Sequence, residues 1–181
     1  MRHLALLALL LPTLSLAGEL KGVTLPDQVD VSGKSLTLNG MGVRTKLLFS
    51  VYVAGLYLEH PTKDAAAILN AKETRRVHMK MVRDVDHAKL GESIREGFKE
   101  NNEANMPALA PRLARLMAGL PDVVKGDEIV ITCIPGTGAQ VSVKGKDAGT
   151  LEGDDFSAAL LAVWLGSHPV DGGLKDGLLG R

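Results

Sequence analysis

The sequence has one cysteine, no excess of charge of either sign and, beyond its N-terminus, no apolar run long enough to span a bilayer. With only Cys133, no disulfide can form within the chain, and the apolar residues around it predict a buried thiol that acts as a small hydrophobe. The 21 basic and 21 acidic residues balance. The chain therefore lacks the basic stripe of a nucleic-acid-binding domain and a polybasic segment for anionic membranes, and we expect no nucleic acid as a partner.

The common catalytic and cofactor motifs are also lacking. The five histidines show no spacing typical of metal ligands, and no serine occupies a nucleophile elbow. The segment Gly40-Met41-Gly42 leads into a strand rather than a helix, so it does not fit a dinucleotide-binding loop. We therefore expect no metal and no cofactor, and the motifs assign no catalytic residue.

The N-terminal residues have the organisation of a secretory signal peptide. Basic residues precede the apolar run 4–11, and Ser15 and Ala17 supply the small side chains that signal peptidase needs before Gly18. The apolar run is shorter than the about 20 residues of a spanning helix, which argues against a retained anchor. We predict a signal peptide over 1–17, cleaved between Ala17 and Gly18. Residues 18–181 are then expected to form a single domain without a transmembrane segment, in a protein that is periplasmic or secreted.

Hydrophobic periodicity predicts an α+β fold, in which an antiparallel sheet carries helices on one face. Alternating apolar residues on either side of Ser32-Gly33-Lys34 indicate two strands joined by a tight turn. The run 47–58 is apolar on both faces, which predicts a central strand covered on both sides. Further strands are expected at 76–85, 127–134, 140–143 and near 150–151. No repeat or linker divides the chain.

Helices are expected after residues that favour a helix N-terminus, at about 64–71, 87–102, 107–119, 155–165 and 172–178. The second of these shows apolar residues spaced by four, and the fourth has the strongest helical periodicity in the sequence. The expected caps, in chain order, are Thr62, Asp86, Asp154 or Asp155, and Asp171.

Arg44 is the unusual polar residue of the predicted sheet. Its permanent charge borders a strand that is apolar on both faces, and two preceding glycines let another backbone approach closely. Arg44 either reaches water from a sheet edge, or it points into a cavity and pairs with an anionic ligand, a carboxylate or a phenolate, to which Tyr52 adds a hydroxyl. On one straight strand the two side chains would lie about 27 Å apart. They converge only if the chain reverses near Thr45-Lys46, where no turn-forming residue stands.

Three segments are distinctive when taken together: Gly40-Met41-Gly42-Val43-Arg44, the run VYVAGLYLE over 51–59, and the run FSAALLAVWLG over 156–166 with Pro169. They resemble the chalcone isomerase-like family, in particular its small exported bacterial members. The resemblance extends from about Val31 to Leu179. It implies an open-faced β-sandwich, an antiparallel sheet layered with helices, which agrees with the fold class that the periodicity predicts.

The family's functional residues carry over only in part. Arg44 matches the arginine that plant chalcone isomerases use to stabilise a phenolate, and Ser157 falls where those enzymes place a serine or threonine near the substrate. Tyr52 stands at the position of the catalytic threonine, and the catalytic tyrosine and active-site asparagine align near Asp86 and Ser93. An aspartate donates no neutral hydrogen bond unless its pKa is far raised. The same fold also serves non-catalytic relatives that bind fatty acids through an arginine and a tyrosine, a pair that Arg44 and Tyr52 resemble.

Three functions are compatible with these residues. The first is non-catalytic binding of a fatty acid or similar small amphipathic anion, with Arg44, Tyr52 and Ser157 as the predicted ligand-binding residues. The second is an isomerase or lyase reaction on a small phenolic or enone substrate. The third is a structural or interaction module whose cavity is filled and whose Arg44 pairs internally with an Asp or Glu. The observation that distinguishes them best is whether a cavity opens beside Arg44.

Overall fold

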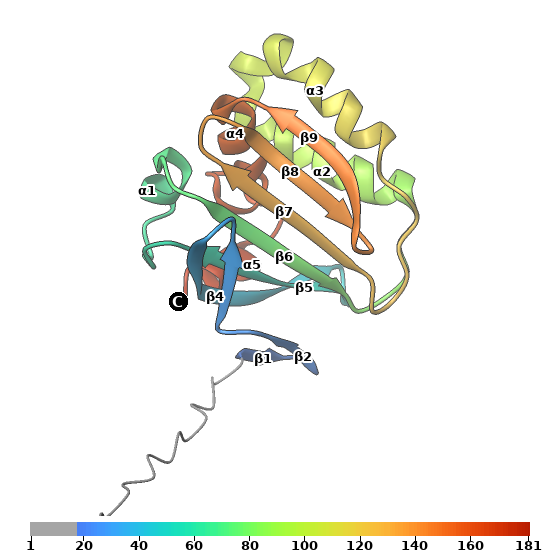
Figure 1. The fold of residues 1–181 in the computed structure, drawn as a ribbon. Helices are drawn as coiled ribbons and strands as arrows, with labels where there is room; N and C mark the ends of the chain where they lie inside the picture. The colour runs from blue at the N-terminus through green and yellow to red at the C-terminus, as the bar shows by residue number, and fades with distance from the viewer. Residues whose placement is uncertain (1–17) are drawn as a thin grey trace, which may run out of the picture.

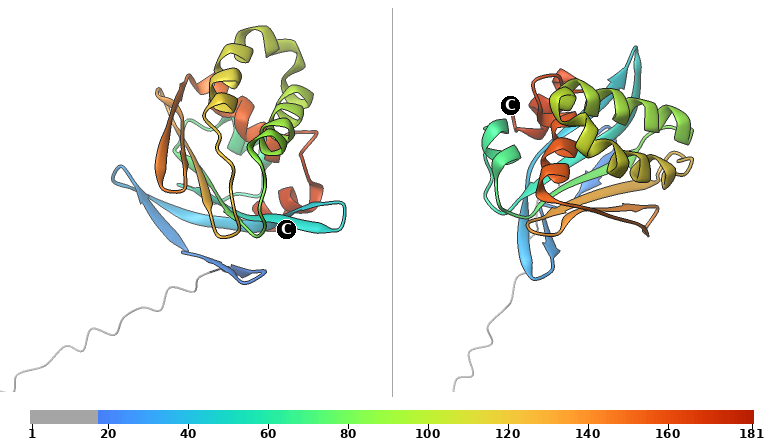
Figure 2. Two further views of the ribbon diagram at one scale, coloured as in Figure 1. Left: turned by 90° about the vertical axis from the view of Figure 1, so that its right-hand side faces the viewer. Right: turned by 90° about the horizontal axis from the view of Figure 1, so that it is seen from above.

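A seven-stranded antiparallel sheet organises residues 18–181, the part of the chain that the computed structural model describes (Figure 1). The strands follow one another in sequence order from one edge of the sheet to the other, so that each pairs with its neighbours in the chain. The sheet curls, and helices gather over one of its faces (Figure 2). The strands are β3 (Gln28–Val31), β4 (Lys34–Lys46), β5 (Phe49–Leu58), β6 (Arg75–Met81), β7 (Glu128–Ile134), β8 (Gly138–Val143) and β9 (Lys146–Glu152).

This arrangement confirms the predicted α+β class, an antiparallel sheet layered with helices. The helices are α1 (Ala65–Asn70), α2 (His87–Asn102), α3 (Met106–Ala118), α4 (Asp154–Leu165) and α5 (Gly172–Leu178), with a short 3-10 turn at Glu103–Asn105 before α3. The predicted signal peptide, 1–17, lies outside the described residues. None of the helices in the described part of the chain is long and apolar enough to cross a membrane.

The hairpin between β4 and β5 differs from the prediction. Residues 47–58 are expected as one strand, but β4 continues to Lys46, Leu47 and Leu48 form the turn, and β5 begins at Phe49. Leu47 adopts a left-handed φ of 58°, which costs about 1–2 kcal/mol for a residue other than glycine. The turn forms without a turn-forming residue because the β4–β5 ladder pairs the two strands from Thr37↔Leu58 to Lys46↔Phe49.

The two faces of β5 belong to different hydrophobic cores, as its two-sided apolar pattern predicts. Tyr52, Ala54 and Leu56 face the larger core, which lies between the sheet and the helices. Val53 and Tyr57 face a smaller core on the opposite side, which is covered by a hairpin that the sequence does not predict. That hairpin consists of β1 (Gly18–Leu20) and β2 (Val23–Leu25).

Two of the predicted helix caps are confirmed and two are wrong. Asp86 caps α2 and Asp171 caps α5, each by accepting a hydrogen bond from a backbone N–H of the first turn. The cap of α1 is Asp64, whose carboxylate accepts from two backbone N–H groups, while Thr62 stands outside the helix and accepts from the N–H of Asp64. The residue before α4 is Gly153, and Asp154 and Asp155 lie in the first turn of the helix instead.

Candidate functional site

Arg44 and Tyr52 are direct cross-strand partners in the β4–β5 ladder. Opposed residues of an antiparallel pair project from the same face, with Cβ atoms about 5 Å apart. Because the chain reverses at Leu47-Leu48, the separation of about 27 Å expected for one straight strand does not arise. The reversal on which convergence depends is therefore present, next to Thr45-Lys46 and without a turn-forming residue, and the pair lies on the face that the helices cover.

The two glycines before Arg44 bring α5 against β4. A Cβ added to Gly42 would lie 2.6 Å from the carbonyl oxygen of Leu174, and one added to Gly40 would overlap the carbonyl oxygen of Gly177. Only glycine at these positions lets the α5 backbone lie directly on the strand. The Gly-Met-Gly segment therefore has a packing role, and it places Asp171, the cap of α5, next to Arg44.

Asp171 connects the start of α5 to the end of β4. Its Oδ1 atom accepts from the N–H of Leu174 at 3.0 Å, and its Oδ2 atom accepts from the N–H of Thr45 at 2.9 Å. The same Oδ2 lies 3.5 Å from Nη1 of Arg44, which also donates to the carbonyl of Thr45. Since the Arg44 side chain is only 14% exposed, its charge is partly desolvated and Asp171 is its internal counter-ion.

Tyr52 is fixed by a partner from the opposite layer. Nε1 of Trp164, on α4, donates to the Tyr52 hydroxyl oxygen at 2.9 Å, in a buried contact. The hydroxyl oxygen thus acts as an acceptor, and its own proton is left to donate. Burial raises the pKa of Tyr52 to about 12, so the phenol stays neutral at ordinary pH. A neutral donor beside Arg44 suits an anionic ligand, which a phenolate would repel.

A cavity of about 410 Å³ opens beside Arg44 and Tyr52. Its walls come from the β4–β5 hairpin, the segment between β6 and α2, and the first two turns of α2. The volume falls within the range of about 300–1,000 Å³ that is typical of small-molecule sites. The other residues that line it are Lys46, Leu47, Phe49, Val51, Arg83, Asp84, Val85, Asp86, Lys89, Leu90, Glu92 and Ser93.

A much smaller void of about 30 Å³ continues inward from this cavity, between the sheet and the helices. The two spaces share Tyr52, Leu90 and Ser93 as lining residues. The remaining walls of the void are apolar residues of the larger core and Trp164. An alkyl chain does not fit into so small a space, so a ligand bound to the protein in this form would occupy the outer cavity.

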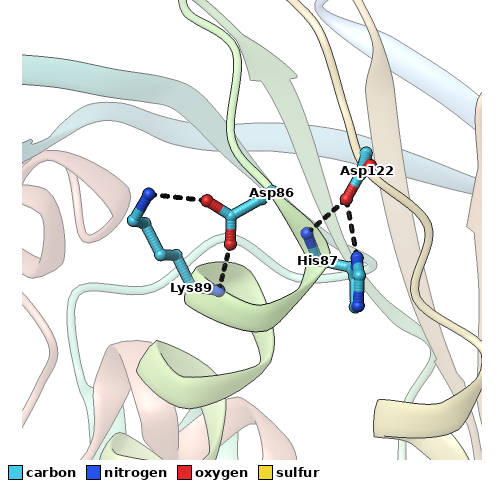
Figure 3. Close-up of polar contacts among 4 residues, drawn as sticks. All are labelled: Asp86, His87, Lys89 and Asp122. Carbon is cyan, nitrogen blue, oxygen red and sulfur yellow. Dashed lines mark hydrogen bonds and ion pairs between the residues drawn. The ribbon is translucent and has the colours of Figure 1, made fainter.

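Asp86 and Ser93, which the resemblance aligns near the family's catalytic tyrosine and active-site asparagine, also line the cavity. Figure 3 shows how Asp86 is bound: its Oδ1 accepts from the N–H of Lys89 at 2.8 Å, and its Oδ2 lies 2.6 Å from Lys89 Nζ. These contacts with Lys89 hold the pKa of Asp86 below its usual range. The next residue, His87, contacts Asp122 rather than Asp86. Asp122 Oδ1 accepts from the backbone N–H of His87 and lies 2.7 Å from His87 Nδ1. Asp86 is therefore ionised at neutral pH and cannot donate the hydrogen bond of a neutral acid.

Ser157, the third predicted ligand-binding residue, is not brought to this cavity. It lies on α4, is 1% exposed, and its hydroxyl has no hydrogen-bond partner among the described residues. Its carbonyl oxygen lies 3.9 Å from the sulfur of Cys133, on β7. Cys133 is buried as predicted, and burial raises the pKa of its thiol to about 11. The structure thus unites Arg44 and Tyr52 and places Ser157 elsewhere in the core.

Sequence reasoning missed the partners of both central residues. Asp171 and Trp164 appear in the sequence as a helix cap and a helix-core residue, and these roles are correct. Their contacts with Arg44 and Tyr52 join segments far apart in the chain, so no local pattern indicates them. The two glycines before Arg44 were the one available signal, because they predict that a backbone packs closely there.

Comparison with known proteins adds two findings. A family model described as chalcone isomerase-like matches residues 17–180. Among solved structures, the chain is similar to the crystal structure of a fatty-acid binding protein from Arabidopsis thaliana, with a TM-score of 0.68 and 17% sequence identity. That similarity covers 87% of this chain and 92% of the plant protein. A search of curated protein sequences finds no match.

Proposed function

Because the chain belongs to the chalcone isomerase-like family, and because its cavity has Asp86 and Ser93 near the positions where the resemblance implies a catalytic tyrosine and asparagine, we propose that it is a non-catalytic binding protein for a fatty acid or a similar amphipathic anion. The observation that carries the proposal is the placement of Arg44 and Tyr52 as cross-strand partners on the wall of one cavity. The plant protein of similar fold is a fatty-acid binding protein, which supports a binding role. Export to the periplasm or the outside of the cell remains part of the proposal.

The carboxylate of the ligand is placed at Arg44 and Tyr52. Arg44 uses Nη1 for its contacts with Asp171 and Thr45, and the described residues provide no partner for its Nε and Nη2 groups. These groups can donate to a carboxylate in a charge-assisted pair. The Tyr52 hydroxyl, already held by Trp164, supplies a neutral donor on the same face of the sheet.

The hydrocarbon part of the ligand is placed against the apolar walls of the outer cavity. Leu47, Phe49, Val51, Val85 and Leu90 provide that surface. A chain that lies there removes its own apolar area and that of the wall from water, at about 25 cal/mol per Å². An acyl chain longer than the cavity either emerges at the hairpin or enters the inner void by moving α2 from the sheet.

Two alternatives are less well supported by the contacts. For an isomerase or lyase, the position of the neutral catalytic tyrosine is occupied by Asp86, which Lys89 keeps ionised. A structural module with a filled cavity would pair Arg44 internally, and Asp171 does so at 3.5 Å. Asp171 is not among the residues that line the cavity, however, and the 410 Å³ space beside Arg44 is not filled by side chains.

The test is binding of a fluorescent long-chain fatty acid to delipidated protein. Arg44→Gln should weaken binding by about 1.5–3 kcal/mol, the usual value of a charged hydrogen bond. Arg76→Gln is the matched control, because Arg76 bonds to Thr132 away from the cavity. The methyl ester of the same fatty acid should bind the wild-type and Arg44→Gln proteins alike. Absence of fatty-acid binding by the delipidated wild-type protein would rule the proposal out.

A further inference from the structure

The described part of the chain has four exposed large hydrophobic side chains, and three of them are consecutive. Leu47, Leu48 and Phe49, at the tip of the β4–β5 hairpin, are 88%, 92% and 60% exposed. Val124 is the fourth, at 50%. Single exposed hydrophobic residues are common on protein surfaces, but a contiguous apolar tip usually marks a contact with a partner or a membrane.

Val124 belongs to the same end of the molecule as the hairpin tip. The guanidinium of Arg83 lies 5.0 Å from the centre of the Phe49 ring. The next residue, Asp84, accepts a hydrogen bond at 2.8 Å from the N–H of Lys125, which follows Val124. In Figure 1 the loops before α2 and after α3 run down the same side of the molecule as this end of β5, and Figure 2 shows the hairpin tip projecting beyond them. We call these residues the hairpin-end patch: Leu47, Leu48, Phe49 and Val124, with Lys46, Arg83, Asp84 and Lys125.

Neither the turn nor the core requires leucine at the hairpin tip. Leu47 is strained, because its φ of 58° is one that Gly or Asn adopts at lower cost. Leu48 is almost fully exposed, so it gains little from packing within the chain. Both side chains are thus unfavourable for the isolated protein in water and become favourable when the tip enters an apolar medium.

The charged residues around the hairpin tip indicate what kind of apolar medium the tip would enter. Lys46, Arg83 and Lys125 are exposed, and no carboxylate of the described residues forms an ion pair with them. Of the acidic residues near the patch, Asp86, Asp122 and Asp127 pair with Lys89, His87 and Lys144. That leaves Asp84 and Glu92 against three unpaired basic side chains, so the basic side chains are in slight excess. Unpaired lysine and arginine next to exposed leucine and phenylalanine complement the anionic headgroups and acyl region of a bilayer.

We propose that the hairpin-end patch docks on an anionic lipid bilayer. Leu47, Leu48 and Phe49 enter the headgroup–acyl boundary, and Lys46, Arg83 and Lys125 contact the phosphates. The cavity beside Arg44 opens at this end, since Lys46, Leu47, Phe49 and Arg83 line it as well. A second copy of the chain fits the patch less well, because self-association would oppose the same basic residues. Docking does not depend on the proposed function. Docking would also bring the cavity opening to the bilayer, where a fatty acid could enter or leave the cavity, and this exchange rests on the proposed function.

The test measures partition onto vesicles by co-sedimentation. The protein used consists of residues 18–181, because the apolar segment 4–11 would bind lipid by itself. Residues 18–181 include every strand and helix of the described fold and both hydrophobic cores. The protein should bind vesicles of phosphatidylglycerol mixed with phosphatidylcholine, and much less to phosphatidylcholine alone. Leu48→Ser combined with Val124→Ser should reduce binding about tenfold or more. Both residues are exposed and neither lines the cavity, so folding and fatty-acid binding in solution should be kept.

Two charge variants provide a matched comparison. Lys125→Gln should reduce vesicle binding about fivefold, whereas Lys63→Gln, with the same change of net charge beyond the opposite end of β5, should leave it unchanged. Arg44→Gln should weaken fatty-acid binding and retain vesicle binding, so failure of either proposal is seen separately. The docking proposal is overturned if the wild-type protein does not bind the anionic vesicles, or if the Leu48→Ser/Val124→Ser protein binds them equally well. It is also overturned if sedimentation shows that the wild-type protein dimerises and this variant does not.

Discussion

Asp171 Oδ2 lies 3.5 Å from Arg44 Nη1 and accepts the backbone N–H of Thr45 at 2.9 Å, so one carboxylate joins α5, β4 and the charge beside the cavity. The carboxylate keeps its other oxygen for the cap of α5. A ligand carboxylate near Arg44 would therefore meet a guanidinium whose charge is already partly balanced. Asp171 consequently sets the attachment of the helix and would also set the strength of the proposed anion site.

Replacement of Asp171 by Asn should separate these two roles. The amide oxygen can accept from Leu174 or from Thr45 but no longer offers two charged oxygens, so we expect a loss of about 1 kcal/mol in the free energy of unfolding. Fatty-acid affinity should rise, because the competing negative charge is gone. Urea unfolding and ligand titration measure the two effects.

The control for this substitution is Asp64→Asn. Asp64 accepts both of its cap hydrogen bonds on Oδ1, so the amide oxygen of asparagine can replace it. Asp64 does not line the cavity, and its substitution should leave fatty-acid affinity unchanged. A lower affinity in the Asp171→Asn protein would contradict the view that Asp171 competes with the ligand.

The Tyr52 hydroxyl should contribute to both stability and binding. In Tyr52→Phe, Nε1 of buried Trp164 loses its acceptor, and we expect the free energy of unfolding to fall by about 1–3 kcal/mol. The affinity for a fatty acid should fall as well. Tyr57→Phe is the control, since its hydroxyl donates to the carbonyl of Pro26 in the smaller core at 2.8 Å. It should lower stability and leave affinity unaltered; equal losses of affinity in both variants would refute a direct role for Tyr52.

Burial of Tyr52 predicts a loss of stability in alkali. Its pKa is raised to about 12 in the folded protein, against about 10 in an unfolded chain. The folded state therefore keeps a proton that the unfolded state releases, and this contribution, up to about 3 kcal/mol, is complete below pH of about 10 and is lost as the pH rises through about 12. Urea midpoints across this range should fall less steeply in Tyr52→Phe than in the wild type. A tyrosinate absorbance that titrates fully near pH 10 in the folded protein would contradict the assignment.

Local patterns were sufficient to predict most of the fold. Alternation and caps locate the strands and helices, and Asp86 and Asp171 begin the helices that the sequence assigns to them. The reversal at Leu47-Leu48 could not be predicted, because its left-handed leucine is stabilised by pairing along the whole β4–β5 ladder rather than by turn chemistry. That single error separated Arg44 from Tyr52 in the sequence-based interpretation.

The surface features depend on contacts between distant segments in the same way. Lys46, Arg83 and Lys125 come from three separate parts of the chain, so the sequence shows no polybasic segment although the fold gathers them at one end. The internal partner of Arg44 is likewise a residue near the C-terminus. The chemical types of the site residues are visible in the sequence, but their pairing is a property of the folded sheet.

The contact between α5 and β4 is open to a direct test at Gly42. A methyl group there would lie 2.6 Å from the carbonyl oxygen of Leu174 and 2.9 Å from its Cδ1 atom, so Gly42→Ala must displace α5 or bend β4. We expect a loss of about 1–3 kcal/mol in the free energy of unfolding, of the size seen when a packed core is overfilled. Because α5 carries Asp171, the fatty-acid affinity should change as well.

Gly172→Ala, within α5 itself, is the contrasting substitution, because a Cβ has room at this position. A Cβ at this position meets no atom within 4 Å, and alanine favours a helix over glycine, so stability should rise by about 0.5–1 kcal/mol while affinity stays constant. Urea unfolding of both variants measures the difference. If Gly42→Ala were as stable as the wild type, the glycines of β4 would not be needed for the close approach of α5. The position of Asp171 beside Arg44 would then require another explanation.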